Sequence, residues 1–388
     1  MSAALTARSV EILRDLIAFP TISTDSNLAM IDYLAERLTA RGALVLITRD
    51  ETGEKANVFA TLGPDVKGGV LLSGHSDVVP VTDQDWTTDP FALTEADGLL
   101  YGRGTCDMKG FIAAAMALAE SIDPAALKRP LHFAFTHDEE TGCLGAGHLV
   151  KDLEARGIVP DIAIIGEPTE MKIIEGHKGC YEYTTRFTGL EGHGSAPDLG
   201  VNAAEYAVRY VSRLMALREG LVARTPKGSR FDPPYTTINI GRISGGVAHN
   251  VIVGKAEVDW EMRPVQVSDA DFVKSEIGRY CEEELLPAMR RVHPSASIHT
   301  TAIGEVAGLE PMEHNAAREL VAELTGANSA ETVPFGTEAG LFQALGSHVV
   351  VCGPGSIRQA HKPDEYLARE QLVLCCDMLV KLGERLSR

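Results

Sequence analysis

The sequence predicts an α/β fold in which a mostly parallel sheet, covered by helices, is interrupted by an inserted ferredoxin-like α+β domain. In residues 1–180, short apolar runs alternate with stretches of helical periodicity, which is typical of a parallel sheet with helices on both faces. Residues 181–306 follow a βαββαβ order instead. The first pattern returns in residues 307–388, so we expect a main domain in two parts around the insert.

The main domain begins with apolar positions at helical spacing in residues 8–41, which predict two helices around a break at 20–26. Short apolar runs farther along predict buried strands, and helical periodicity returns between them. We expect these strands at residues 70–73, 131–135, 162–165 and 349–352, and the further helices at residues 110–121, 145–155 and 315–324.

The insert shows the pattern of an antiparallel sheet with helices on one face. We expect its strands at residues 182–188, 236–243, 253–263 and 298–303, and its helices at residues 202–218 and 269–290. This order predicts a compact ferredoxin-like insert.

Composition narrows the classes of function. Hydrophobic residues make up 45% and charged residues 23% of the 388 positions, which is ordinary for a globular protein. The formal net charge of -18 repels phosphate backbones and anionic headgroups, so neither nucleic acid nor a membrane is an expected partner. Glu11 and Asp15 interrupt the N-terminal apolar pattern, unlike a secretory signal. Seven cysteines without a CxxC pair favour a cytoplasmic location.

Hard metal ligands gather where the predicted strands end. In open α/β sheets, ligands bind at the carboxyl ends of strands, so groups that are far apart in the sequence can converge there. One further candidate follows the last predicted strand. The candidates are His75, Asp77, Asp107, Asp138, Glu139, Glu140, Glu167 and His361.

Two imidazoles and several carboxylates suit zinc, cobalt or manganese better than calcium, which prefers an all-oxygen shell. Any one of these residues alone is more simply a hydrogen-bonded surface residue, and their recurrence after strand ends favours a metal site. Other chemistries have weaker support, because the chain has neither a GxSxG elbow nor a phosphate-binding loop. Cys106 is a candidate nucleophile, but a small buried thiol is the simpler interpretation.

The segments GHSDVVP, YGRGTCDMKG, DEETG, GEPT and QAHKPDE together resemble the co-catalytic zinc metallopeptidase superfamily of aminoacylases, dipeptidases and succinyl-diaminopimelate desuccinylase. The likeness covers essentially the whole chain. It implies hydrolysis of a linear amide bond by two divalent metals per subunit, zinc first and cobalt as the alternative. It also implies a small N-acyl amino acid as substrate, and a homodimer formed through the insert, which the family uses as a lid and dimerisation domain.

The resemblance assigns a metal-binding role to five residues. Asp107 corresponds to the carboxylate that bridges both ions. His75 and Glu167 correspond to the ligands of one ion, and Glu140 and His361 to those of the other.

Two further acids take other roles. Glu139 corresponds to the general base, which takes a proton from water and passes it to the leaving amine. Asp77 resembles the carboxylate that orients a metal-bound imidazole, here that of His75. The alternative for Asp77 is an acid that caps the following turn.

The insert contributes three candidates by the same resemblance. His193, in GHGSAP, corresponds to a histidine that reaches the partner subunit's active site and stabilises the oxyanion, with an ordinary loop residue as the alternative. Asn250 and Arg263 correspond to residues that hold the substrate carboxylate, although Arg263 also suits an ion pair within the domain. Many relatives have GHSSxP and ASN where this chain has GHGSAP and AHN, so the oxyanion geometry follows less directly than the metal shell.

Specificity is indicated by HKG at residues 177–179 and FGTEAG at residues 335–340, which look like the deacetylase subgroup. Glu338 then suits a cationic side chain of the substrate, with a carboxylate at a helix start as the alternative. A desuccinylase or a broad N-acyl-amino-acid deacylase is the alternative enzyme. A non-catalytic metal-binding or amino-acid-binding protein is the alternative from another class.

Overall fold

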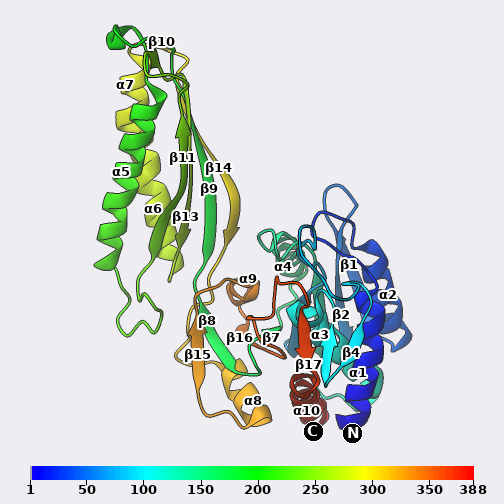
Figure 1. Cartoon of the computed structure of the whole chain (residues 1–388). Helices are drawn as coiled ribbons and strands as arrows, with labels where there is room; N and C mark the ends of the chain where they lie inside the picture. Colours follow the sequence, from blue (N-terminus) through cyan, green and yellow to red (C-terminus); the bar gives the residue numbers. More distant parts are fainter. Residues whose placement is uncertain (1) are drawn as a thin grey trace. The chain divides into compact units, whose positions relative to one another are not determined.

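Residues 2–388 are described by a computed structural model, which divides them into two units (Figure 1). Unit 1 contains the residues up to Gly176 together with Pro311–Thr332 and Thr337–Arg388. Unit 2 contains His177–Glu310 and Val333–Gly336. The predicted insert of residues 181–306 lies inside unit 2, which is slightly longer at both ends and also includes a short segment from beyond residue 307.

The sheet of unit 1 is parallel in its centre. Neighbouring pairs β6–β3, β3–β7 and β7–β16 are parallel, whereas β1–β2, β2–β6 and β16–β8 are antiparallel. Strands β3 and β6 are buried along their whole length, as expected for strands covered on both faces. In spatial order the strands are β1 (Leu44–Arg49), β2 (Ala56–Leu62), β6 (Leu131–Thr136), β3 (Val70–His75), β7 (Ile162–Pro168), β16 (His348–Gly353), β8 (Ile173–His177) and β15 (Ala330–Val333).

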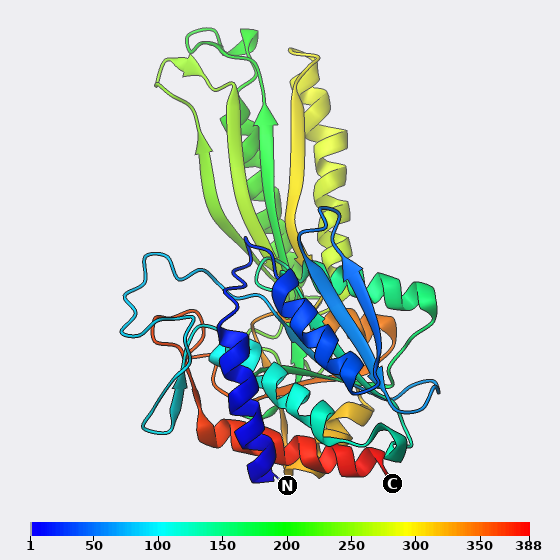
Figure 2. The same cartoon turned by 90° about the vertical axis from the view of Figure 1, so that its right-hand side faces the viewer.

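Helices cover both faces of this sheet, so the predicted α/β class is confirmed. Figure 2 shows α1, α3 and α10 side by side, and α2 and α8 pack into the same layer. The other face carries α4 and α9, which contact each other. The helices are α1 (Ser2–Ile17), α2 (Leu28–Ala40), α3 (Gly110–Ser121), α4 (Leu144–Arg156), α8 (Ala316–Thr325), α9 (Ala339–Leu345) and α10 (Arg369–Leu386).

A small antiparallel sheet of β4 (Thr94–Ala96), β5 (Leu99–Tyr101) and β17 (Tyr366–Ala368) joins two loops of unit 1. Strand β17 pairs with β5 at Tyr366 and Tyr101. This pairing draws the segment before β17 towards the segment after β5, and both segments carry metal-ligand candidates.

Unit 2 is an antiparallel four-stranded sheet with two long helices along one face (Figure 1). Tyr183, Tyr210 and Trp260 form the aromatic centre of its core. This is the predicted ferredoxin-like arrangement. Its elements are β9 (Cys180–Thr188), β10 (Gly192–His193), α5 (Ala203–Val222), β11 (Thr237–Gly245), β12 (Val251–Ile252), β13 (Lys255–Arg263), α6 (Val267–Tyr280), α7 (Leu286–Arg290) and β14 (Ser297–Val306).

Two further findings concern the described residues as a whole. None of the helices within residues 2–388 combines the length and apolar character that crossing a bilayer requires. All seven cysteines are free thiols.

Candidate metal centre

Three adjacent strands deliver candidate ligands to one edge of the sheet. His75 is the last residue of β3, Glu167 lies near the end of β7, and Glu139 follows β6. The spatial order β6–β3–β7 therefore brings these side chains together at the carboxyl edge, as predicted. Gly166 allows β7 to pack closely against α3, because a Cβ at this position would lie 2.0 Å from the ring of Phe111.

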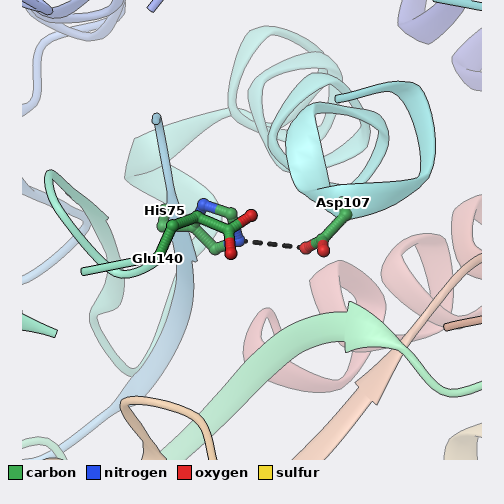
Figure 3. Close-up of side chains that lie close together, drawn as sticks. All are labelled: His75, Asp107 and Glu140. Carbon is green, nitrogen blue, oxygen red and sulfur yellow. Dashed lines mark hydrogen bonds and ion pairs between the residues drawn. The ribbon is translucent and has the colours of Figure 1, made fainter. Parts of the chain in front are cut away.

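Asp107 lies between two imidazoles. Its Oδ1 is 3.0 Å from His75 Nε2, and its Oδ2 is 3.2 Å from His361 Nε2. Figure 3 shows the carboxylate facing the imidazole of His75, with Glu140 beside that ring. One carboxylate that presents a separate oxygen to each imidazole has the arrangement required of a bridging ligand.

The remaining carboxylates divide between the two imidazoles. Glu167 Oε1 is 3.8 Å from His75 Nε2, whereas Glu140 is 3.1 Å from His361 Nε2. Ligand atoms of His75, Asp107 and Glu140 lie within 4.8 Å of one another, and so do those of His75, Glu139 and Glu167. The structure thus brings together all five residues predicted to bind metal.

The electrostatics of this cluster fit bound cations. Burial raises the pKa of Glu167 well above its usual range and also raises that of Glu140, with Asp107 adding to both shifts. Glu167 Oε1 is buried without a hydrogen-bond partner among the described residues. Buried, crowded carboxyl groups stay ionised only with positive charge nearby, and imidazole nitrogens with carboxylate oxygens form a donor set typical of zinc. The residues therefore fit two divalent ions.

Glu139 lies in the same space as the ligands. Burial raises its pKa to about 8, and Cys143 Sγ donates to its Oε1 at 3.5 Å. A carboxyl group with such a pKa can hold and release a proton near neutrality, as a general base requires. The division of roles between Glu139 as base and Glu140 as ligand remains a prediction, because both reach the cluster.

The side chain of Asp77 holds the backbone of the acidic turn, which is formed by residues 138–140. Its carboxylate accepts hydrogen bonds from the N–H groups of Glu139 at 3.0 Å and Glu140 at 3.4 Å. Ser23 Oγ donates to it at 2.7 Å. The carboxylate lies 3.6 Å from His75 Nδ1, whose closer partner is the Asp77 backbone carbonyl at 2.9 Å. Asp77 thus touches the imidazole chiefly through its backbone, and its side chain caps the acidic turn.

Two of the unit 2 candidates come together. His193 pairs with Val251 in the β10–β12 ribbon, and Gly194 N donates to Asn250 O at 2.7 Å. Both His193 and Asn250 are exposed, and His193 Nδ1 lies 2.8 Å from Ser195 Oγ. These two residues are therefore available at one surface of unit 2.

Arg263 lies elsewhere in unit 2, at the far end of β13. Its guanidinium contacts Glu261 Oε2 at 2.7 Å, which is the ion pair within the domain. Cys180, Glu182 and Glu261 also have ligand atoms within 4.8 Å of one another, but the Arg263 cation already offsets their charge. The role of Arg263 in holding substrate stays a prediction that this pairing does not favour.

Glu338 lies inside unit 1 with no exposed surface. Ser73 Oγ donates to its Oε1 at 2.6 Å, and Thr136 Oγ1 donates to its Oε2 at 2.7 Å. These hydroxyls belong to β3 and β6, so the carboxylate ties together the two strands that lead to His75 and Glu139. Glu338 also stands at the start of α9, which is the alternative expected from the sequence. Contact with a substrate cation stays a prediction, which this buried and hydrogen-bonded position does not favour.

Four residues that support the candidate ligands were not assigned from the sequence, and they are Ser23, Lys55, Arg103 and Glu365. Lys55 Nζ lies 2.5 Å from Asp138 Oδ1 and thereby fixes the start of the acidic turn. Arg103 and Glu365 form a buried pair beside Asp107 and His361. Arg103 and Glu365 stand inside the recognised segments YGRGTCDMKG and QAHKPDE, which was the available signal, whereas Ser23 and Lys55 stand in no recognised segment.

Comparison with known proteins agrees with this geometry. A model described as peptidase family M20/M25/M40 matches residues 71–385. The chain is 40% identical to an acetylornithine deacetylase of Proteus mirabilis (strain HI4320), over 92% of this chain and 91% of that protein. It is 38% identical to an acetylornithine deacetylase of Shigella sonnei (strain Ss046), over 92% of each. An M20 family metallo-carboxypeptidase from Sulfolobus solfataricus shares the fold, with a TM-score of 0.73, 17% identity and coverage of 98% and 99%.

Proposed function

The chain belongs to peptidase family M20/M25/M40, and we propose that it hydrolyses N-acetyl-L-ornithine to L-ornithine and acetate, a step of arginine biosynthesis. The observation that carries the chemistry is Asp107 between His75 and His361, with Glu139, Glu140 and Glu167 around them. The observation that carries the substrate is the likeness to acetylornithine deacetylases over nearly the whole chain.

The candidate centre would hold two divalent ions, for which we propose zinc, with Asp107 shared between them. Bound ions of this kind polarise an amide carbonyl and make a water molecule more acidic. Glu139 removes the proton from the attacking water as its oxygen bonds to the acetyl carbon. The same carboxyl group then delivers a proton to the nitrogen as the C–N bond breaks, because an amine leaves readily only when protonated.

A homodimer formed through unit 2 is part of the proposal. Edge strands β11 and β14 of its sheet expose Ile243 and Ile303, which are 53% and 57% accessible. Unpaired strand edges with apolar side chains are surfaces that proteins commonly bury against a second chain. In that dimer, exposed His193 would stabilise the oxyanion formed in a partner subunit's active site.

The His193→Ala variant is expected to lose turnover while retaining both metals, because the imidazole is exposed and contacts no ligand candidate within unit 2. Loss of one oxyanion donor typically lowers kcat by about 10² to 10³-fold. Mixing this variant with Glu139→Ala should restore part of the activity, since each mixed dimer then contains one intact site. Absence of recovery after demonstrated subunit exchange would remove the assignment across subunits.

The Glu338→Gln variant is expected to reduce turnover of N-acetylornithine and neutral N-acetylmethionine by the same factor. The reason is that the Glu338 carboxylate is buried and already accepts from Ser73 and Thr136. The measurement is kcat/KM for both substrates with a single enzyme preparation. A loss confined to N-acetylornithine would instead restore the role of Glu338 in reading the substrate's positive charge.

A substrate panel tests the proposed function itself. We expect zinc-loaded protein to turn over N-acetyl-L-ornithine with a higher kcat/KM than N-succinyl-diaminopimelate or other N-acyl amino acids. Preference for the succinylated compound would assign a desuccinylase, and equal rates on many substrates would assign a broad deacylase. Metal binding without turnover of any of them would indicate a binding protein.

A further inference from the structure

A buried ion pair lies beside the candidate metal centre and takes no part in the chemistry proposed above. Arg103 and Glu365 are each 1% exposed, and Arg103 Nη1 lies 2.7 Å from Glu365 Oε2. Removing two charges from water costs more than their attraction returns, unless hydrogen bonds satisfy their remaining atoms. The other partners of this pair therefore indicate what it holds in place.

Glu365 fixes the turn that presents Asp107. Its Oε1 accepts hydrogen bonds from the backbone N–H groups of Cys106 at 2.9 Å and Asp107 at 3.0 Å. Its Oε2 accepts a third from Gly104 N at 3.0 Å. A single carboxylate thus determines the backbone position of the bridging-ligand candidate.

Arg103 extends the same contact network to the loop of His361. Its guanidinium donates to Lys362 O at 3.3 Å and to Gln84 Oε1 at 2.6 Å. Gln84 Nε2 in turn donates to His361 O at 3.1 Å. Trp86 contacts both Arg103 and Gln84. Its ring lies 5.0 Å from the guanidinium carbon of Arg103, and its Nε1 donates to Gln84 Oε1.

His361 depends on such support more than the other ligand candidates do. Its side chain is 52% exposed, whereas that of His75 is 1% exposed. Its φ of 62° lies in the left-handed region, which is unfavourable for a residue with a side chain. The distance of 3.2 Å between His361 and Asp107 therefore depends on how the two loops are held to each other.

We propose that Arg103, Glu365 and Gln84 are positioning residues that set the spacing between Asp107 and His361 and thereby fix the affinity for the ion bound by Glu140 and His361. The inference rests on the proposed two-ion site and is independent of the identity of the substrate. The ion bound by His75 and Glu167 depends less on this network, because both residues are fixed by β3 and β7.

The test is zinc binding to the full chain, measured by competition with a chromophoric chelator. In Glu365→Gln and Gln84→Ala, the affinity for one of the two zinc ions is expected to fall by about 10 to 100-fold. This is the usual effect of removing a residue that holds a metal ligand in place. The affinity for the other ion should fall less in Glu365→Gln, because that ion shares only Asp107 with this network, and should stay at the wild-type value in Gln84→Ala. Activity should fall at limiting zinc and recover at saturating zinc. The selective loss of affinity for one ion is the response that general destabilisation would not give.

Two further variants serve as controls. Glu175→Gln removes a buried carboxylate that pairs with Arg318 at 2.6 Å elsewhere in unit 1, and both zinc affinities should remain unchanged. Arg103→Lys keeps the charge but lacks the planar fork that reaches Glu365, Lys362 and Gln84 together, so an intermediate loss is expected. Gln84→Ala removes no buried charge and therefore decides the outcome if Glu365→Gln does not fold.

Wild-type affinities for both equivalents in Gln84→Ala and in any folded Glu365→Gln protein would overturn the proposal. Equal weakening of both equivalents would also overturn it, since the effect would not be specific to the His361 side. A wild-type protein that binds fewer than two zinc ions would remove its premise. In contrast, two tight ions without hydrolysis of N-acetylornithine would contradict only the proposed substrate.

Discussion

Chelation of divalent metal is expected to abolish hydrolysis, and zinc or cobalt should restore it. The carboxylates of Asp107, Glu140 and Glu167 remain in the metal-free protein, but the divalent charge that would polarise the amide carbonyl is gone. Bound ions contribute several kcal/mol to such a transition state, which corresponds to a loss of roughly 10³-fold or more. The measurement is kcat on N-acetylornithine before chelation, after dialysis and after stepwise metal addition.

Magnesium serves as the control ion in this experiment. It prefers octahedral oxygen ligands, so it should restore little activity at a centre that contains His75 and His361. The metal-free protein should also unfold at a lower temperature, because ions bound only to the folded state stabilise it. Undiminished turnover by protein shown to contain no metal would contradict the two-ion mechanism.

The central strands were predictable because each contains a run of mostly apolar residues. Strands β3, β6 and β7 occupy the expected runs, and helix α3 has the expected bounds, Gly110–Ser121. Strand β2 was missed because Asn57 interrupts its apolar pattern. In the structure this buried amide donates to Gly145 O and accepts from His137 N, so a tertiary contact explains a residue that breaks the local pattern.

The ligand set was predictable for a different reason. His75 and Glu167 stand at the ends of recognisable strands, and residue type alone limits the chemistry available there. The supporting contacts were not predictable in this way. Glu338 meets Ser73, and Arg103 meets Glu365, across more than two hundred residues of sequence, so only the folded chain shows that these charged groups are buried and paired.

The Glu139→Gln variant is expected to lose nearly all turnover while its folding and metal content stay close to wild type. The amide keeps the size and polarity of the side chain and can still accept from Cys143, but it cannot take a proton from water. An amine that leaves without protonation is a poor leaving group, so the step that Glu139 serves becomes limiting. The expected loss is at least about 10²-fold in kcat with little change in KM.

The matched variant Glu140→Gln separates the two adjacent acids. Glu140 lies 3.1 Å from His361 and belongs to the group with His75 and Asp107, so its replacement should lose one metal equivalent. The measurement is therefore kcat and metal content on both proteins side by side. Loss of a metal in Glu139→Gln, with full occupancy in Glu140→Gln, would mean that the two roles are exchanged. Near-normal kcat in Glu139→Gln with two bound metals would place the base on another residue, because the only group assigned to move the proton would then be dispensable.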